Sequence, residues 1–208
     1  MDRLHVVKLI AVGVLATGAL AGCERDREDK AQARPSGGRV DAVKAGAKKQ
    51  DVTAAEFCDA RAESAGAAPQ LGMPALAGGK APPGNGSWRW INVWATWCKP
   101  CIEEMPDLAR WHDDLAGQGV KFDLVFVSVD DSDELVTKFR ERHPDTPPSL
   151  RLADPDDLPK WLSAIGLGDS APIPVHVFVD PDDKVRCVRA GGVKEKDLPA
   201  VRSILGAS

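Results

Sequence analysis

An apolar segment that runs directly into a two-cysteine motif constrains the fold of this chain more than any other feature. The sequence WRWINVWA at residues 88–95 is rich in aromatic and β-branched side chains, which is typical of a strand. Cys98 and Cys101 follow at once in WCKPC, and apolar side chains then recur at helical spacing from Ile102 to Leu115. The sequence therefore predicts a strand, a cysteine-bearing turn and a helix in direct succession.

Downstream of this motif, strands and helices are predicted to alternate. Residues 121–130 have an almost continuously apolar centre, which is typical of a parallel strand covered on both faces. Strands are also predicted at 175–179 and 184–189, because the DPDD sequence between them favours a tight turn. The order β-α-β, α, β-β-α predicts an α/β fold, with a central mixed sheet flanked by helices. The remaining predicted elements are an extended piece at 150–154 and helices at 131–143, 156–165 and 194–205.

The first residues have the pattern of a targeting segment. Residues 9–20 are apolar and follow two basic residues, but a membrane span needs about 20 apolar residues, so the stretch better suits a signal-peptide core. The sequence LAGC that ends at Cys23 resembles the bacterial lipobox, which implies cleavage before this cysteine and its lipidation. We therefore expect a signal peptide at 1–22 and an extracytoplasmic protein anchored to a membrane, on the periplasmic side in a Gram-negative cell. An ordinary secretory signal with a chance cysteine is the alternative.

The residues after Cys23 differ sharply in composition from the rest. Residues 24–50 contain no Leu, Ile, Phe or Trp and carry mixed charge, so they cannot offset the entropy cost of ordering. We predict a flexible tether at 23–51; the alternative is a patch that binds lipid headgroups, since its second half is basic. Residues 52–208 are enough for one domain with a real core. The net charge of −4 and the lack of a strongly basic face argue against nucleic acid as a partner.

The spacing of Cys98 and Cys101 fits half of a zinc site, a structural disulfide or a redox-active dithiol. No second C-x-x-C or histidine pair completes a four-ligand zinc site, so no metal is expected. The combination of NVWATWCKPCIEEMP, an isolated IPV and VFVDPDDKV resembles the thioredoxin fold. More narrowly, residues 91–205 resemble the membrane-tethered TlpA/ResA-type thiol-disulfide oxidoreductases. A copper metallochaperone and a thiol peroxidase are the alternatives. Wider spacing of the two cysteines would suit the metallochaperone better, and a loop with a lone attacking cysteine would suit the peroxidase better.

The resemblance implies an enzyme that reduces disulfides in client proteins and needs no organic cofactor. It also implies clients such as apocytochrome c or a copper-oxidase subunit, and recharging by a dithiol protein embedded in the membrane. Cys98 is predicted to be the nucleophile and the more exposed thiol, because a helix N-terminus favours the thiolate. Cys101 is predicted to be the buried, resolving thiol. Lys99 either adds positive charge beside Cys98 or is an ordinary solvated lysine, and Pro100 stiffens the first helical turn.

Five further positions have expected roles in or near the site. Trp97 is expected to be a partly exposed platform beside the dithiol. The resemblance implies that Ile173 and Pro174 form a cis peptide bond that packs against the dithiol, where an extended client chain can pair with the backbone. Asn92 stands where cytosolic thioredoxins carry a proton-relaying aspartate, and an amide cannot replace it. Glu104 is therefore the candidate base; the alternative is an ordinary exposed helix glutamate.

Cys58 and Cys187 remain after the dithiol and Cys23 are assigned. An even number of unassigned cysteines in an exported domain indicates a disulfide bridge between them. Two separate buried thiols are the alternative. His112 and His176 are interpreted as packed histidines rather than metal ligands.

Overall fold

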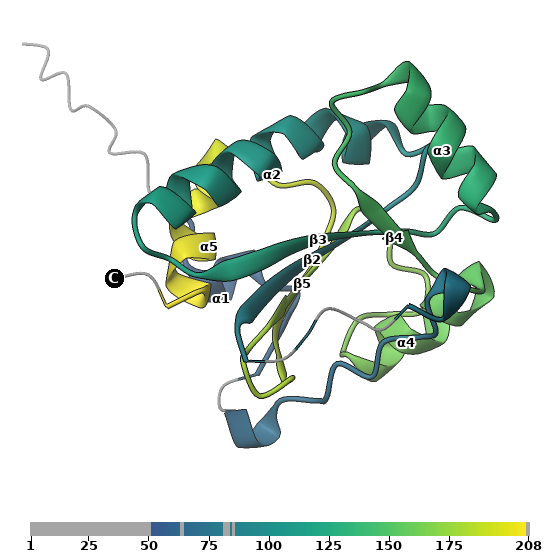
Figure 1. The fold of residues 1–208 in the computed structure, drawn as a ribbon. Coiled ribbons are helices and arrows are strands. Elements are labelled where there is room, and N and C mark those ends of the chain that lie inside the picture. The colour runs from purple at the N-terminus through teal and green to yellow at the C-terminus, as the bar shows by residue number, and fades with distance from the viewer. Residues whose placement is uncertain (1–50, 63–64, 81–83, 85, 207–208) are drawn as a thin grey trace, which may run out of the picture. The chain divides into compact units, whose positions relative to one another are not determined.

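A six-stranded mixed sheet organises the part of the chain that the computed structural model describes, residues 51–62, 65–80, 84 and 86–206 (Figure 1). The strand order is β1-β6-β5-β2-β3-β4. β3 pairs in parallel with both β2 and β4. On the other side of β2, the pairs β2–β5, β5–β6 and β6–β1 are antiparallel. The strands are β1 (Ala60–Arg61), β2 (Trp88–Trp94), β3 (Phe122–Ser128), β4 (Ser149–Arg151), β5 (Val175–Val179) and β6 (Val185–Ala190).

Helices cover both faces of this sheet. Figure 1 shows α2 and α3 over one face and α4 on the opposite side. The helices α1 and α5 pack against each other on the α2 side, where Arg189 of β6 reaches the backbone of Phe57. The α-helices are α1 (Ala54–Phe57), α2 (Lys99–Gly117), α3 (Asp133–Arg142), α4 (Leu158–Ala164) and α5 (Leu198–Ile204). Short 3-10 turns occur at Ala65–Ala67, Ala77–Gly79, Pro155–Asp157 and Glu195–Asp197.

The strand β2 lies at the centre of the sheet, and its alternating side chains hold α2 in place. The indole of Trp90 stacks on Trp111 of α2 with ring centroids 6.3 Å apart, and on Phe178 of β5 at 5.0 Å. Both tryptophans are completely buried, so this aromatic stack anchors the middle of α2 on the sheet. Pro106 lies inside α2, which still forms one helix from Lys99 to Gly117.

The predicted order of elements is present, and the sheet is wider than the sequence pattern indicated. The extended piece expected at 150–154 is the edge strand β4, which pairs with β3. A second edge strand, β1, was not predicted, because two residues give no periodic pattern. The segment 65–80, for which no element was predicted, forms single bridges from Gln70 to Lys184 and from Leu76 to Leu152.

The predicted signal peptide, Cys23 and the tether up to residue 50 lie outside the described residues. Within the described ranges, every helix is too short or too polar to cross a lipid bilayer.

Candidate dithiol site

The two motif cysteines form a disulfide at the N-terminus of α2. Cys98 is the N-cap residue of the helix, and its Sγ accepts a hydrogen bond from the Cys101 backbone N–H at 3.3 Å. Cys101 is completely buried, whereas Cys98 keeps 4% of its surface exposed. One first-turn N–H, that of Cys101, thus points at Cys98 Sγ, and a position at a helix N-terminus favours a thiolate on this sulfur once the bond is reduced.

A buried carboxylate fixes the loop that precedes Cys98. Asp130, just beyond the end of β3, accepts hydrogen bonds from the Thr96 backbone N–H at 3.0 Å and from the Thr96 hydroxyl at 2.6 Å. The hydroxyl of Ser128 donates a third bond, also at 2.6 Å. Asp130 therefore ties the loop that follows β2 to the end of β3, the strand that pairs in parallel with β2. The role of Asp130 was not predicted, although an aspartate directly after an apolar strand was a visible signal.

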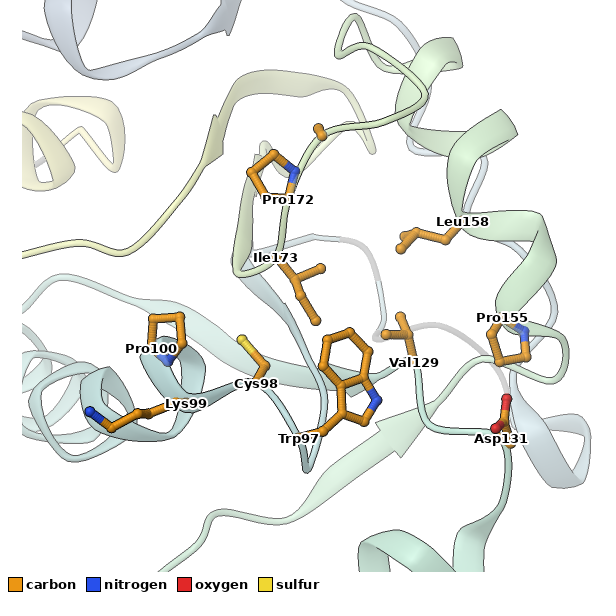
Figure 2. Close-up of a pocket in the computed structure, with 11 residues that line it drawn as sticks. Trp97, Cys98, Lys99, Pro100, Val129, Asp131, Pro155, Leu158, Pro172 and Ile173 are labelled. Carbon is orange, nitrogen blue, oxygen red and sulfur yellow. The ribbon is translucent and has the colours of Figure 1, made fainter.

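An apolar groove of about 770 Å³ opens beside Cys98. Figure 2 shows the Cys98 side chain between Pro100 and Trp97, and Ile173 also lines the groove. The Trp97 ring is 70% exposed, and the Ile173–Pro174 peptide bond is cis. An extended apolar chain that lies in this groove would bring its own sulfur next to Cys98. The groove is lined by Trp97, Cys98, Lys99, Pro100, Val129, Asp131, Pro155, Leu158, Ala171, Pro172 and Ile173.

The ammonium group of Lys99 points into solvent rather than towards the sulfur (Figure 2). It forms an exposed ion pair with Glu103 one turn along α2, at 2.9 Å. Exposed pairs of this kind contribute about 0–1 kcal/mol, because water and salt screen them. The structure therefore gives Lys99 little electrostatic influence on Cys98.

Glu104 is buried beneath the dithiol, one helical turn beyond Cys101, and is only 5% exposed. Its Oε1 accepts a hydrogen bond from Asn92 Nδ2 on β2 at 2.9 Å. Its Oε2 accepts one from the Val193 backbone N–H, also at 2.9 Å. His176 of β5 completes the surroundings, with Nε2 3.4 Å from Glu104 Oε1. Three elements thus converge on one carboxylate, which excludes an ordinary exposed helix glutamate.

The segment that carries Val193 is fastened to α2 by Glu195. The Glu195 carboxylate accepts hydrogen bonds from Arg110 at 3.0 Å and from the Trp111 indole at 3.1 Å. The Arg110 hydrogen bond, followed by that of Trp111, holds the pKa of Glu195 below its usual value. The two hydrogen bonds hold Glu195, two residues after Val193, against α2.

The arrangement of these elements agrees with a match to a known family. The model of the AhpC/TSA family matches residues 67–188, which is more than half of the chain. The chain belongs to the AhpC/TSA family. The matched region includes the dithiol, Glu104 and the cis-proline, and it ends before Val193 and Glu195.

Curated relatives of this AhpC/TSA-family chain carry the name thiol-disulfide oxidoreductase ResA. The protein from Geobacillus thermodenitrificans is 33% identical over 114 residues, 55% of this chain and 60% of the relative. The protein from Bacillus subtilis is 29% identical over 111 residues, 53% of this chain and 57% of the relative. The chain therefore spans about 60% of the length of the curated relatives that it matches.

A solved structure shows the same thioredoxin fold. The thioredoxin-related protein from Neisseria meningitidis serogroup B superimposes with a TM-score of 0.50 at 23% identity. The superposition covers 63% of this chain and 96% of that protein. The fold of this AhpC/TSA-family member is therefore the thioredoxin fold, with a central mixed sheet flanked by helices.

Away from the dithiol, a second disulfide joins Cys58 to Cys187, two residues separated by 129 positions. It attaches the segment after α1 to the buried strand β6, next to the β1–β6 pairing. His112 is partly exposed and packs its ring edge against Phe122, with centroids 5.1 Å apart. Among the described residues, no three histidine, cysteine or acidic side chains gather where they could hold a metal ion.

Proposed function

We propose that this chain is an extracytoplasmic thiol-disulfide oxidoreductase that reduces disulfides of client proteins through Cys98 and Cys101. One observation carries the proposal: a disulfide at a helix N-terminus opens onto an apolar groove bounded by Trp97 and the cis Ile173–Pro174 bond. The names of the ResA relatives support it, as does the predicted signal peptide.

The first step uses the reduced protein and the Cys98 thiolate. Its sulfur attacks one sulfur of the client disulfide, so that a Cys98–client bond forms and the client S–S bond breaks. The other client sulfur leaves as a thiolate and takes a proton from solvent. The client chain lies extended in the groove beside Ile173, where its backbone can pair with the loop as an added edge strand.

The second step uses Cys101 and Glu104. The Glu104 carboxylate accepts the proton of the Cys101 thiol, directly or through a water, since it lies one helical turn away. The Cys101 sulfur then attacks Cys98 Sγ, the internal disulfide forms, and the second client sulfur is expelled as a thiolate. Glu104 returns the proton to that thiolate. Two electrons have then passed from the dithiol to the client.

The clients and the reductant are proposed from the resemblance of this chain to the TlpA/ResA-type proteins. Apocytochrome c haem-binding cysteines and copper-site cysteines of an oxidase subunit are the proposed clients. A membrane-embedded dithiol protein would reduce the Cys98–Cys101 bond after each turnover, and a lipid on Cys23 would keep the domain near it.

Reduction of insulin disulfides by the fully reduced protein tests the proposal. We expect stoichiometric appearance of insulin thiols and recovery of the Cys98–Cys101 disulfide, and no insulin thiols after alkylation with iodoacetamide. Equilibration with glutathione gives the reduction potential, which decides whether the protein acts as a reductant or an oxidant. Tight copper binding without disulfide exchange would instead favour a metallochaperone, and rapid consumption of peroxide would favour a peroxidase.

Glu104→Gln should slow release of the mixed disulfide by about 100-fold at neutral pH, because the amide cannot accept the Cys101 proton. The same change removes a buried negative charge near the thiols, so Cys98 should react faster with iodoacetamide. Single-turnover release and alkylation rates measure the two effects, which have opposite signs. Glu103→Gln, on the exposed side of α2, is the matched control. Unchanged release in Glu104→Gln would show that Glu104 is not the base.

Cys23→Ser should release the protein from membranes without changing the activity of the folded domain. An alkaline wash of membranes separates the two states, since it removes peripheral proteins and retains lipid-anchored ones. A variant that still sediments with the membrane after this wash would show that Cys23 is not the anchor.

A further inference from the structure

The apolar groove beside Cys98 contains a carboxylate to which the mechanism above gives no role. Of the eleven residues that line the groove, Lys99 and Asp131 are the charged ones. Figure 2 shows these two side chains at opposite ends of the lining, with Cys98 and Trp97 between them. A client chain that lies along the groove and over the reactive sulfur therefore meets a different charge at each end.

The charge at the Lys99 end of the groove is compensated within the protein. Lys99 Nζ lies 2.9 Å from the carboxylate of Glu103, and both side chains are exposed. The two opposite charges cancel at a distance, so this end offers a client no net charge to recognise.

The Asp131 carboxylate at the other end is not compensated by the described residues. It is exposed, and no hydrogen bond or ion pair joins it to another residue of the described ranges. Arg151, on the edge strand β4, is engaged elsewhere, because its Nε donates to Asp133 at 2.8 Å and its Nη1 to the Leu152 carbonyl at 2.7 Å. Lys160 of α4 lines a separate hollow. Asp131 therefore keeps its negative charge available to a ligand.

The turn Pro155–Asp157 adds negative charge near the same end. Pro155 and Leu158 line the groove, and the residues between them, Asp156 and Asp157, are both exposed. Several carboxylates on one side of an apolar groove create a field that attracts a positive group of a ligand. The Asp131 end of the groove thus favours a basic side chain.

The part of the groove between its two charged ends is apolar. The Trp97 ring is 70% exposed, whereas Val129 is buried and Leu158 is half-buried. An exposed indole in the wall of a groove favours contact with an apolar side chain of a ligand, because both surfaces then leave water. The groove therefore combines an apolar contact near Cys98 with a negative charge beyond it.

We propose that the groove selects client segments in which an apolar residue and then a basic residue follow the reactive cysteine on one side. The apolar side chain would cover Trp97, and the basic side chain would face Asp131. The inference rests on the proposed function, because the client disulfide is attacked there by Cys98. It adds the chemical class of the client segment and the direction in which that segment lies along the groove.

Binding of short peptides without cysteine tests the inference, since it requires no disulfide exchange. The peptides carry serine in place of the client cysteine and leucine beside it. A single lysine is moved through the remaining positions on both sides, and matched peptides carry glutamine or glutamate instead. The oxidised full chain is titrated with each peptide, and the backbone ¹H–¹⁵N signals of Cys98 and Val129 report binding.

Lysine on one side of the serine should tighten binding by about three- to fivefold relative to glutamine, and glutamate there should weaken it. Lysine on the other side, towards Lys99, should have no such effect. The preference should fade in 1 M salt, where the Debye length is about 3 Å.

Two substitutions of Asp131 separate its charge from the shape of the groove. Asp131→Asn should abolish the preference for lysine, and Asp131→Lys should reverse it in favour of glutamate. Trp97→Ala should weaken every peptide by about tenfold and leave the preference in place. Asp113→Asn is the control, because Asp113 is an exposed aspartate of α2 outside the groove, and it should leave both affinity and preference unchanged.

Equal affinities of the lysine, glutamine and glutamate peptides for the wild type would overturn the inference, and so would a lysine preference that persists in Asp131→Asn. Failure of every peptide to shift the groove signals would also overturn it. Signals that shift with protein concentration alone would show that a second copy occupies the groove, which contradicts a client site. A wild-type protein that shows the expected preference but reduces no disulfide would refute the proposed function and not the selectivity of the groove.

Discussion

Cys101→Ser is expected to convert the protein from a turnover catalyst into a trap for its clients. Cys98 keeps its place as the N-cap of α2 in this variant, so the attack on a client disulfide still proceeds. The serine hydroxyl cannot displace the client, because it is far more weakly acidic than a thiol. Release should therefore fall by a factor of about 1,000 or more, in line with the loss of a catalytic nucleophile.

Cys98→Ser is the companion variant with a different expected result. The remaining thiol, Cys101, is completely buried, so neither a mixed disulfide nor reduction of insulin should be detectable. Non-reducing electrophoresis with mass spectrometry of the adducts distinguishes the two variants. Full multiple-turnover activity in Cys101→Ser, or trapped clients in Cys98→Ser, would contradict the assigned order of the two thiols.

Replacement of both Cys58 and Cys187 by serine is expected to have the largest effect on stability. The bond closes a loop of 129 positions, and the chain-entropy model assigns about 5 kcal/mol to a loop of that length. Domains of this size unfold with about 5–15 kcal/mol, so the loss is a large part of the total. The double variant leaves neither Cys58 nor Cys187 as an unpaired thiol that could exchange with Cys98.

The structure indicates which contacts depend on that bond. The bond ties the end of α1 to β6, where Phe57 packs edge-on against Phe178 with centroids 5.9 Å apart. Urea unfolding of the oxidised protein and the variant measures the difference, and selective reduction of the Cys98–Cys101 bond in the wild type is the control. A difference below about 1 kcal/mol would show that the N-terminal segment holds its place by packing alone.

The strand, the dithiol turn and the helix were predictable, because they follow one another directly in the sequence. Aromatic and β-branched residues at 88–95 and helical spacing after Cys101 are local signals, and the structure has β2 and α2 at these positions. The prediction of an α/β thioredoxin fold is confirmed by the family match and the fold comparison. Edge strands such as β1 were not predictable, since two residues have no period.

The surroundings of Glu104 could not be predicted in the same way. Spacing along the helix placed Glu104 on the Cys101 side of α2, but its burial depends on partners from elsewhere in the chain. Val193 is 89 positions away in sequence, and the Trp90–His176 bond spans 86. A histidine between two valines in a strand gives no sign of the ring or carboxylate that it will meet. Asp130 and Thr96 likewise meet only because β2 and β3 are adjacent.

The low solvent exposure of Cys98 limits when a client protein can be reduced. The sulfur lies between Trp97 and Pro100, and only 4% of the residue is accessible (Figure 2). A disulfide inside a finished globular protein cannot approach such a recessed atom along the required S–S axis, whereas one on a loose chain can. Under the proposed function, reduction is therefore restricted to the interval between export of a client and completion of its folding or cofactor loading.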